Sequence, residues 1–359
     1  MNWKKIALVI AAAAMIFTGC GDKNTEEPEQ QNSTEEVSAL DRGMEALEQG
    51  KYDEAIAFFE KMIGNEEDIE HAYRGLGIAY MGREEFEAAV EAFDQALSNA
   101  GADAGRLEYD ISYYKAAALV RLGRLNDALV VYDNLAAYKP EKKTYVGRGA
   151  VYARMGNMDK AREDFDSALE QDAKNYDLYI EIFRMFCEGG REDIGQEYLK
   201  RALSIDKEPD KNNFEKGKIY YYLAQYDKAR AELDKVNGIS EPEAVLYLAR
   251  TYEKLDDPEY AQRLYREYLE LDSRDGNIYN MLALAAMSTG DYEEALETVQ
   301  EGIEKAEYGM QDLYHNEIVI YEKLADFDTA KEKMEVYLEN YPDDEAAAKE
   351  YIFLKTRSK

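Results

Sequence analysis

The sequence predicts an all-α protein built from repeated pairs of helices, and three observations support this prediction. First, a small residue recurs nine times, with separations of 34, 39, 33, 34, 34, 32, 34 and 35 residues. Second, a large apolar residue follows each small residue by four positions, which places both on the same face of a helix. Third, turns such as Gln49-Gly50-Lys51 and Thr289-Gly290-Asp291 stand just before the small residues, and Gly favours the left-handed conformation that ends a helix.

Residues 1–19 are predicted to be a signal peptide. Lys4 and Lys5 precede an apolar run, Ile6 to Phe17, that is too short to span a bilayer comfortably as a helix. The run ends in Phe17-Thr18-Gly19-Cys20, which resembles the lipobox of bacterial lipoproteins, although Phe17 stands where Leu is usual.

The resemblance to a lipobox implies that Cys20 is lipidated on sulfur, with palmitate among the acyl chains, and becomes the mature N-terminus. Such a lipid would hold the protein on the extracytoplasmic side of the cell membrane without a spanning helix. The alternative is an ordinary signal peptide that is cut near Gly19 and leaves Cys20 unmodified. Residues 20–36 are rich in Glu, Gln, Asn, Ser and Thr, which is typical of a flexible tether.

Residues 37–342 contain the repeats, in which a first helix precedes the helix that carries the small residue. The small residues are Ala55, Ala89, Ala128, Ala161, Gly195, Ala229, Ala261, Ala295 and Ala330. Twelve positions before them, seven of nine residues are Gly or Ala, so the two helices of a repeat can approach closely. Phe183 and Ile318 are the exceptions, and Gly195 replaces the usual Ala, so we expect the fifth unit to pack irregularly. Residues 343–359 are predicted to form one more amphipathic helix that caps the stack.

The composition excludes several classes of function. The chain has 44 Lys plus Arg against 75 Asp plus Glu, a net charge of -31, so binding to nucleic acid is not expected. It has only two His and two Cys, which argues against a metal site, a cofactor or His-based catalysis. No nucleophile, base and orienting group are recognisable together, so we predict that the protein is not an enzyme.

The turn sequences Gly50-Lys51-Tyr52-Asp53-Glu54-Ala55 and Gly290-Asp291-Tyr292-Glu293-Glu294-Ala295 resemble the second-helix entry of the tetratricopeptide repeat. The resemblance extends over residues 36 to 344. It implies a right-handed superhelical solenoid of about nine helix-turn-helix units, in which the first helices line a concave groove that binds protein or peptide segments.

The same resemblance implies that groove residues lie 18, 15, 11, 8 and 7 positions before each small residue. Those positions hold ten cations and eight anions, so the groove is expected to be mixed in charge although the whole chain is acidic. The predicted partner-binding residues are Arg74, Tyr113, Arg121, Arg154, Arg184, Phe214, Lys218, Tyr221, Tyr222 and Arg250.

Two functions are compatible with these features. The first is a membrane-tethered scaffold that binds protein segments and organises a cell-envelope complex. The second is a lipoprotein that captures a soluble peptide or glycan, for which Phe214, Tyr221 and Tyr222 would provide aromatic platforms.

Overall fold

The computed structural model describes residues 38–101, 105–205, 209–236 and 242–357. In these ranges it contains nineteen α-helices and no β-strand, in agreement with the predicted all-α repeat fold. The predicted signal peptide, Cys20 and the tether lie outside the described residues. None of the described helices combines the length and the apolar character that crossing a membrane requires.

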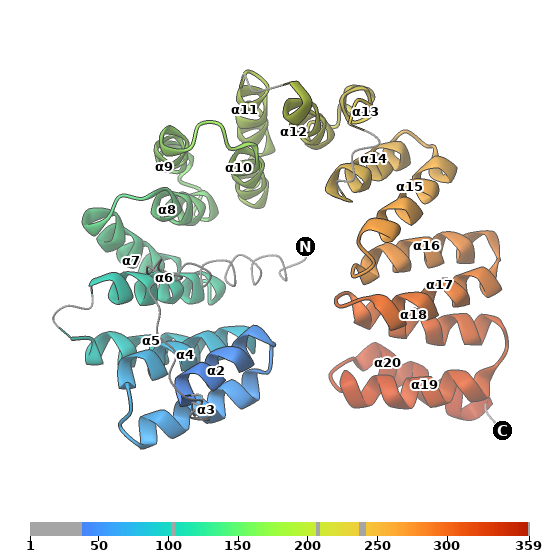
Figure 1. Ribbon diagram of the computed structural model, residues 1–359, viewed down its shortest axis with the longest axis horizontal. Helices are drawn as coiled ribbons and strands as arrows, with labels where there is room; N and C mark the ends of the chain where they lie inside the picture. The colour runs from blue at the N-terminus through green and yellow to red at the C-terminus, as the bar shows by residue number, and fades with distance from the viewer. Residues whose placement is uncertain (1–37, 102–104, 206–208, 237–241, 358–359) are drawn as a thin grey trace, which may run out of the picture. The chain divides into compact units, whose positions relative to one another are not determined.

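The helices alternate as predicted, so that nine pairs are followed by a single helix (Figure 1). The first helices are α2 (Ala39–Glu48), α4 (Ile69–Gly82), α6 (Gly105–Arg121), α8 (Lys142–Arg154), α10 (Tyr176–Glu188), α12 (Pro209–Tyr222), α14 (Pro242–Lys254), α16 (Gly276–Thr289) and α18 (Met310–Lys323). The second helices are α3 (Tyr52–Gly64), α5 (Phe86–Asn99), α7 (Leu125–Tyr138), α9 (Met158–Gln171), α11 (Glu192–Ala202), α13 (Tyr226–Leu233), α15 (Pro258–Leu271), α17 (Tyr292–Lys305) and α19 (Phe327–Asn340). The last helix, α20 (Glu345–Arg357), packs on α19, where a capping helix was predicted.

The chain divides into two compact units, and the division falls within α10. The first unit comprises the chain up to Asn175 and Arg184–Arg191, and the second comprises Tyr176–Phe183 and the chain from Glu192 onward. In the first unit α2 contacts α4, α4 contacts α6 and α6 contacts α8. In the second unit α12 contacts α14 and α16 contacts α18. These pairs of successive first helices therefore lie beside one another.

Close packing between the two helices of a pair explains the Gly or Ala that most first helices carry twelve positions before the repeated small residue. A Cβ atom added to Gly77 would lie 2.5 Å from Cε1 of Phe93, and one added to Gly149 would lie 2.7 Å from Cε1 of Phe165. Contacts that short are far below van der Waals distance, so only a residue without a side chain leaves room for the ring. Each Gly thus stands opposite the large residue that the repeat pattern places on the second helix.

The fifth pair departs from this pattern on both helices. Phe183 occupies the small position on α10, and Gly195 occupies the position of the usual Ala on α11. A Cβ atom on Gly195 would lie 2.9 Å from both Cδ2 and the carbonyl oxygen of Phe183. The smaller residue on α11 therefore makes room for the larger residue on α10.

The ends of the helices follow the turn chemistry of the sequence. Asp257 accepts a hydrogen bond of 3.1 Å from the backbone N–H of Tyr260, and Pro258 occupies the first turn of α15. Proline is tolerated in the first turn because the backbone N–H that it lacks would have no partner within the helix. Gly290 ends α16 in the left-handed region at φ 84°, a conformation that other residues rarely adopt.

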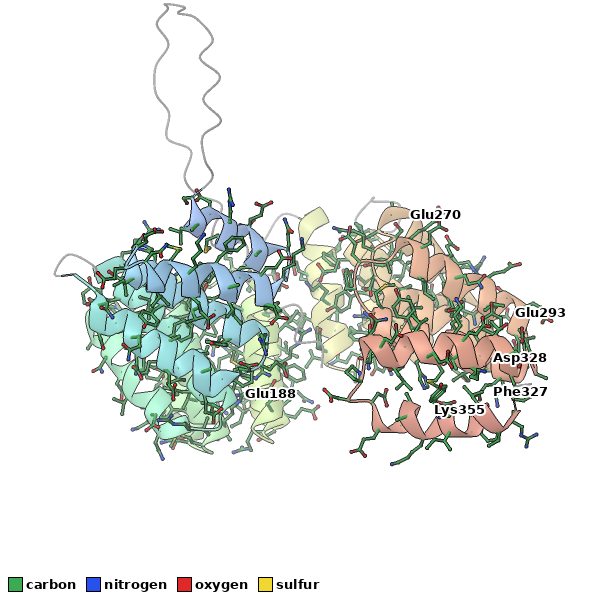
Figure 2. The ribbon with its side chains drawn as sticks, turned by 90° about the horizontal axis from the view of Figure 1, so that it is seen from below. Glu188, Glu270, Glu293, Phe327, Asp328 and Lys355 are labelled. Atoms are coloured by element: carbon green, nitrogen blue, oxygen red, sulfur yellow. The ribbon has the colours of Figure 1, made fainter. Side chains whose placement is uncertain are left out.

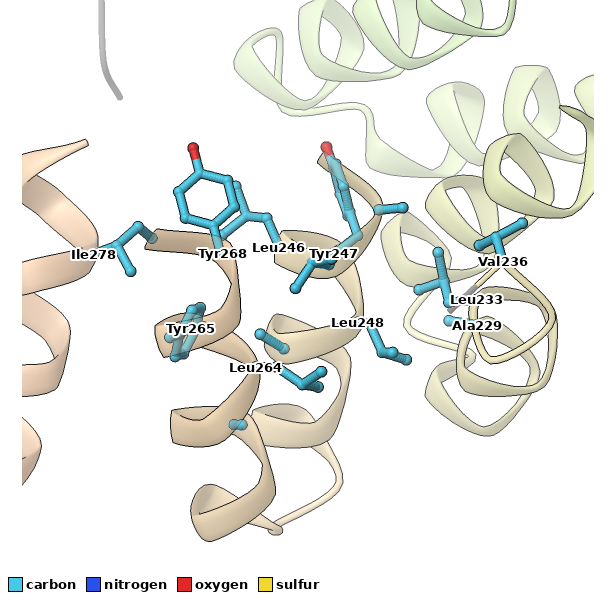
Figure 3. Packing of buried hydrophobic residues seen from close by; sticks show 14 of the residues in the cluster. Ala229, Leu233, Val236, Leu246, Tyr247, Leu248, Leu264, Tyr265, Tyr268 and Ile278 are labelled. Carbon is cyan, nitrogen blue, oxygen red and sulfur yellow. The ribbon is translucent and has the colours of Figure 1, made fainter. Parts of the chain in front are cut away.

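One core cluster of the second unit is built from side chains of α13, α14, α15 and α16. Leu246, Tyr247 and Leu248 of α14 lie among the buried side chains of the cluster shown in Figure 3, together with Leu233 of α13 and Leu264 of α15. Acidic side chains such as Glu270 and Glu293 instead project from the outside of the helices (Figure 2). This separation lets a chain with a large acidic excess retain an apolar core.

Candidate protein-binding surface

Aromatic side chains from α10, α12 and α14 meet in the second unit, and we call Phe183, Phe214, Tyr221, Tyr222 and Tyr247 the aromatic cluster. The ring centroids of Tyr221 lie 5.7 Å from Tyr222 and 5.6 Å from Tyr247, both in edge-on contact. Phe183 lies 5.9 Å from Tyr222, and Phe214 lies 6.3 Å from Tyr247. The hydroxyl groups of Tyr222 and Tyr247 are 2.8 Å apart and form a hydrogen bond.

Sequence reasoning identified three members of the aromatic cluster and missed two. Phe214, Tyr221 and Tyr222 are at predicted groove positions, and all three are partly exposed. Tyr247 lies between two of the five positions considered in its repeat, and its ring is 5% exposed. Phe183 was assigned only to the packing between α10 and α11. The recurrence of aromatic residues at several first-helix positions was the signal that could have indicated a cluster.

Lys218 packs against the aromatic cluster and forms ion pairs with carboxylates of the same chain. Its Nζ atom lies 2.8 Å from Oδ1 of Asp177 on α10 and 3.0 Å from Oε1 of Glu243 on α14. The same atom lies 5.0 Å from the centroid of the Phe214 ring. Burial lowers the pKa of Lys218, but the hydrogen bond and charge of Asp177 and the charge of Glu243 outweigh this effect, so the pKa is raised. Lys218 therefore joins three first helices.

Arg250 lies at the edge of the aromatic cluster. Its guanidinium carbon is 5.8 Å from the centroid of the Tyr247 ring, and the side chain is partly exposed. Within the described residues no carboxylate lies close enough to Arg250 to form an ion pair. Its charge is thus available to a ligand, whereas that of Lys218 is compensated.

Two predicted cations of the first unit bind carboxylates of neighbouring first helices. Nη2 of Arg74 on α4 lies 2.5 Å from Oδ2 of Asp110 on α6. Nη2 of Arg154 on α8 lies 3.0 Å from Oε2 of Glu188 on α10. Both carboxylates belong to the set of predicted groove anions, so the predicted cations and anions pair with one another along the series of first helices.

Arg121 and Tyr113 of α6 also contact other residues of the chain, Arg121 through an ion pair and a cation–ring contact and Tyr113 through ring packing. Nη2 of Arg121 lies 3.3 Å from Oε1 of Glu84, and its guanidinium carbon is 4.4 Å from the centroid of the Phe86 ring. The ring of Tyr113 packs edge-on against Tyr132 at 6.2 Å. Arg184, the remaining predicted residue, is exposed on α10.

The structure therefore brings five of the ten predicted residues together, and these are Phe214, Lys218, Tyr221, Tyr222 and Arg250. Arg74, Tyr113, Arg121 and Arg154 are distributed along α4, α6 and α8 of the first unit. Among the described residues no group of three or more His, Cys, Asp or Glu could hold a metal ion. The chemistry of the surface is that of cation, carboxylate and aromatic contacts, which is suited to binding polypeptide.

Comparison with protein families identifies one family along most of the repeats. A family described as "Tetratricopeptide repeat" matches residues 40–106, 113–176 and 246–309. A second family with the same description matches residues 318–344.

Two curated proteins illustrate the similarity to relatives. TPR repeat-containing protein MJ1428 from Methanocaldococcus jannaschii is 23% identical over 327 residues, which cover 75% of this chain and 57% of that protein. BBSome complex member bbs-4 from Caenorhabditis elegans is 27% identical over 157 residues, which cover 41% of this chain and 34% of that protein. The chain thus spans between about a third and somewhat more than half of the length of these relatives.

Solved structures include similar chains. A tetratricopeptide repeat protein from Parabacteroides merdae is 17% identical, and the match covers 83% of this chain and 98% of that chain with a TM-score of 0.40. A crystal structure of MamA is 21% identical, and the match covers 45% of this chain and 92% of that chain with a TM-score of 0.38.

Proposed function

Because this chain belongs to the tetratricopeptide repeat family, we propose that it is a non-catalytic scaffold that binds protein segments along its first helices and is tethered to a membrane through lipid on Cys20. In this proposal the first helices receive an extended or helical segment of a partner. The lipid keeps the assembly at the cell envelope, on the extracytoplasmic side of the membrane.

The observation that carries the protein-binding proposal is the continuity of side-chain contacts from one first helix to the next. Lys218 of α12 reaches carboxylates on both α10 and α14, and Tyr222 of α12 is hydrogen-bonded to Tyr247 of α14. Such contacts require these first helices to present side chains to a common surface. A segment lying across them would contact several repeats at once, which is how repeat proteins build extended binding surfaces.

The state of the aromatic cluster favours a scaffold over the capture of a soluble glycan. Its rings pack edge-on against one another, and the hydroxyl groups of Tyr222 and Tyr247 bind each other. A sugar needs open ring faces and free hydrogen-bonding groups. Partly exposed rings beside the positive charge of Arg250 are better suited to an apolar side chain and a carboxylate of a peptide.

Site-specific crosslinking tests which face of the repeats binds. Leu284 is 45% exposed on the first helix α16, and Val336 is 57% exposed on the second helix α19. A photoreactive amino acid at each position gives a matched pair in size, polarity and exposure. We expect partner crosslinks from position 284 and few from position 336, and the reverse pattern would disprove binding along the first helices.

A charge reversal tests the role of Arg250. Arg263 of α15 is a suitable control because its guanidinium carbon also lies over a tyrosine ring, at 4.5 Å from the centroid of Tyr260. Arg250→Glu should weaken capture of the crosslinked partner, whereas Arg263→Glu should not. Equal capture by both variants, with an unchanged helical melt, would exclude Arg250 from the binding surface.

The membrane tether has a separate test. Cys20→Ser should remove the diacylglyceryl mass from the N-terminal peptide and reduce the share of the chain that stays in the membrane fraction after a high-salt wash, without changing partner capture in detergent. An unmodified N-terminal peptide in the unsubstituted chain would refute lipidation and would leave the protein-binding proposal intact.

A further inference from the structure

Helix α20 has two apolar faces, and only one of them is covered. Ala347 and Leu354 are completely buried against α19 and its neighbours. On the opposite side Ile352 is 62% exposed and Phe353 is 44% exposed. Adjacent exposed apolar residues that are rimmed by polar groups are a feature of interaction surfaces.

Cations surround this exposed pair. Lys349, Lys355 and Arg357 are all exposed, and the guanidinium carbon of Arg357 lies 5.3 Å from the centroid of the Phe353 ring. Residues 351–357 contain Lys355 and Arg357 and neither Asp nor Glu, within a chain whose net charge is -31. The one charged contact that α20 directs inward is Glu350, which lies 3.3 Å from His315. Nζ of Lys349 also lies 3.9 Å from Oε2 of Glu345, which is exposed on the same helix. The cationic and apolar part of α20 is therefore its C-terminal half, where Lys355 and Arg357 lie beside Ile352 and Phe353.

We propose that the outer face of α20 binds the surface of an anionic phospholipid bilayer. Ile352 and Phe353 would enter the boundary between head groups and acyl chains, and Lys349, Lys355 and Arg357 would contact lipid phosphates. A helix with cations flanking an apolar face has the features of an interfacial membrane helix. The acidic remainder of the chain does not prevent this contact, because charges separated by more than about 8 Å are largely screened at physiological ionic strength.

Charge disfavours a second copy of α20 as the occupant. A symmetric dimer places the same patch of both subunits face to face. Two copies of this face would bring Lys355 and Arg357 of both subunits, four cations, together around the Ile352 and Phe353 side chains, and like charges in contact are destabilising. An anionic surface instead compensates all of these cations at once.

This membrane contact does not rest on the protein-binding proposal, since it uses none of the predicted groove residues. It also differs from the tether at Cys20, because it needs no covalent lipid. The reporter must therefore sense α20 itself rather than attachment of the chain to a vesicle.

Tryptophan fluorescence provides such a reporter. The chain contains a single Trp, Trp3, so the full chain carrying Trp3→Phe and Phe353→Trp emits only from the outer face of α20. Vesicles of phosphatidylcholine containing phosphatidylglycerol should shift this emission to shorter wavelength, and brominated lipid should quench it. Vesicles of phosphatidylcholine alone should have little effect.

Two sets of substitutions separate the roles of charge and apolar contact. Reversing Lys349, Lys355 and Arg357 to Glu should raise the lipid concentration for a half-maximal shift by more than about 100-fold, because each cation near an anionic leaflet strengthens binding about fivefold and each new carboxylate is repelled by it. The matched control reverses three exposed cations of α2, α3 and the turn between them, which are Arg42, Lys51 and Lys61. This control should have little effect on the shift. Ile352→Ser should also weaken the shift while leaving every charge in place.

Several results would overturn the proposal. One is an equal shift with neutral and anionic vesicles, and another is a shift that survives the α20 charge reversal in a chain whose helical melt is unchanged. A shift that needs no vesicles and grows with protein concentration would assign the surface to a second copy of the chain. If the reversal variant does not fold, Ile352→Ser decides, and an undiminished shift in that variant refutes the proposal.

Discussion

Replacing Arg148 by Met should destabilise the protein strongly, because it strands a buried carboxylate. Nε and Nη2 of Arg148 donate to the two oxygens of Asp164 at 2.9 and 2.7 Å, and Nη1 donates to Asp133 at 2.9 Å. The Asp164 side chain is only 6% exposed, so water cannot replace the lost partner. Removing one partner of a buried pair costs about 3–5 kcal/mol, and the partial exposure of Arg148 places the expected loss near 3 kcal/mol.

The corresponding change at Lys218 should cost much less, although Lys218 is the more deeply buried cation. Its partners Asp177 and Glu243 are 71% and 48% exposed, so both carboxylates remain hydrated when the ammonium group is removed. Met also retains the length of the Lys side chain and makes favourable contacts with aromatic rings. We expect Lys218→Met to lower the free energy of unfolding by about 1 kcal/mol.

A double-mutant cycle checks this reasoning. Urea unfolding followed by circular dichroism gives the overall loss, and amide exchange locates it, because repeat arrays need not unfold in one step. Replacing both Arg148 by Met and Asp164 by Leu should recover most of the stability lost in Arg148→Met. The reasoning is refuted if Lys218→Met is as damaging as Arg148→Met, or if the double variant is no more stable than Arg148→Met.

Three further predictions concern packing and ionisation. Gly77→Ala should destabilise the α4–α5 pair by about 1–2 kcal/mol, because its Cβ would collide with a buried ring, whereas Gly64→Ala has open space and should be neutral or slightly stabilising in the same urea unfolding experiment. Gly195→Ala should lower the melting temperature, and adding Phe183→Ala to this variant should restore part of it. If the decreases in melting temperature caused by the two substitutions simply add in the double variant, the two residues do not compensate each other. Burial above all raises the pKa of Tyr337 to about 12. The stability that this shift contributes is present below the unfolded pKa of about 10 and is lost as the pH rises toward 12. Tyr337→Phe should therefore flatten the fall in stability between about pH 10 and 12, and an unchanged pH profile would contradict the assignment.

The repeat pattern was sufficient to predict the helix pairs because it records contacts made within each pair. Gly77 and the ring opposite it belong to a single repeat, so their sizes appear in the sequence at a fixed spacing. Contacts between repeats leave no such fixed spacing. The pairs formed by Lys218 with Asp177 and Glu243 span 41 and 25 residues, and the choice between them depends on how α10, α12 and α14 pack. Phe183 and Gly195 were both visible as departures from the pattern, but the contact between them was not.

The same distinction changes how the charge of the predicted groove should be understood. Counting residues gave ten cations and eight anions, which suggests a weakly positive surface that attracts carboxylates. In the structure Arg74, Arg154 and Lys218 are each within 3.0 Å of a carboxylate of the same surface, so their charges are largely neutralised before any partner arrives. A partner carboxylate gains little at these positions, since it would have to displace an internal one. Specificity then depends on positions such as Arg250, where a cation beside partly exposed aromatic rings has no ion pair within the part of the chain that the structure describes. For this reason the single reversal of Arg250 is a sharper test of partner binding than a reversal that includes Lys218, which would place a third carboxylate between Asp177 and Glu243.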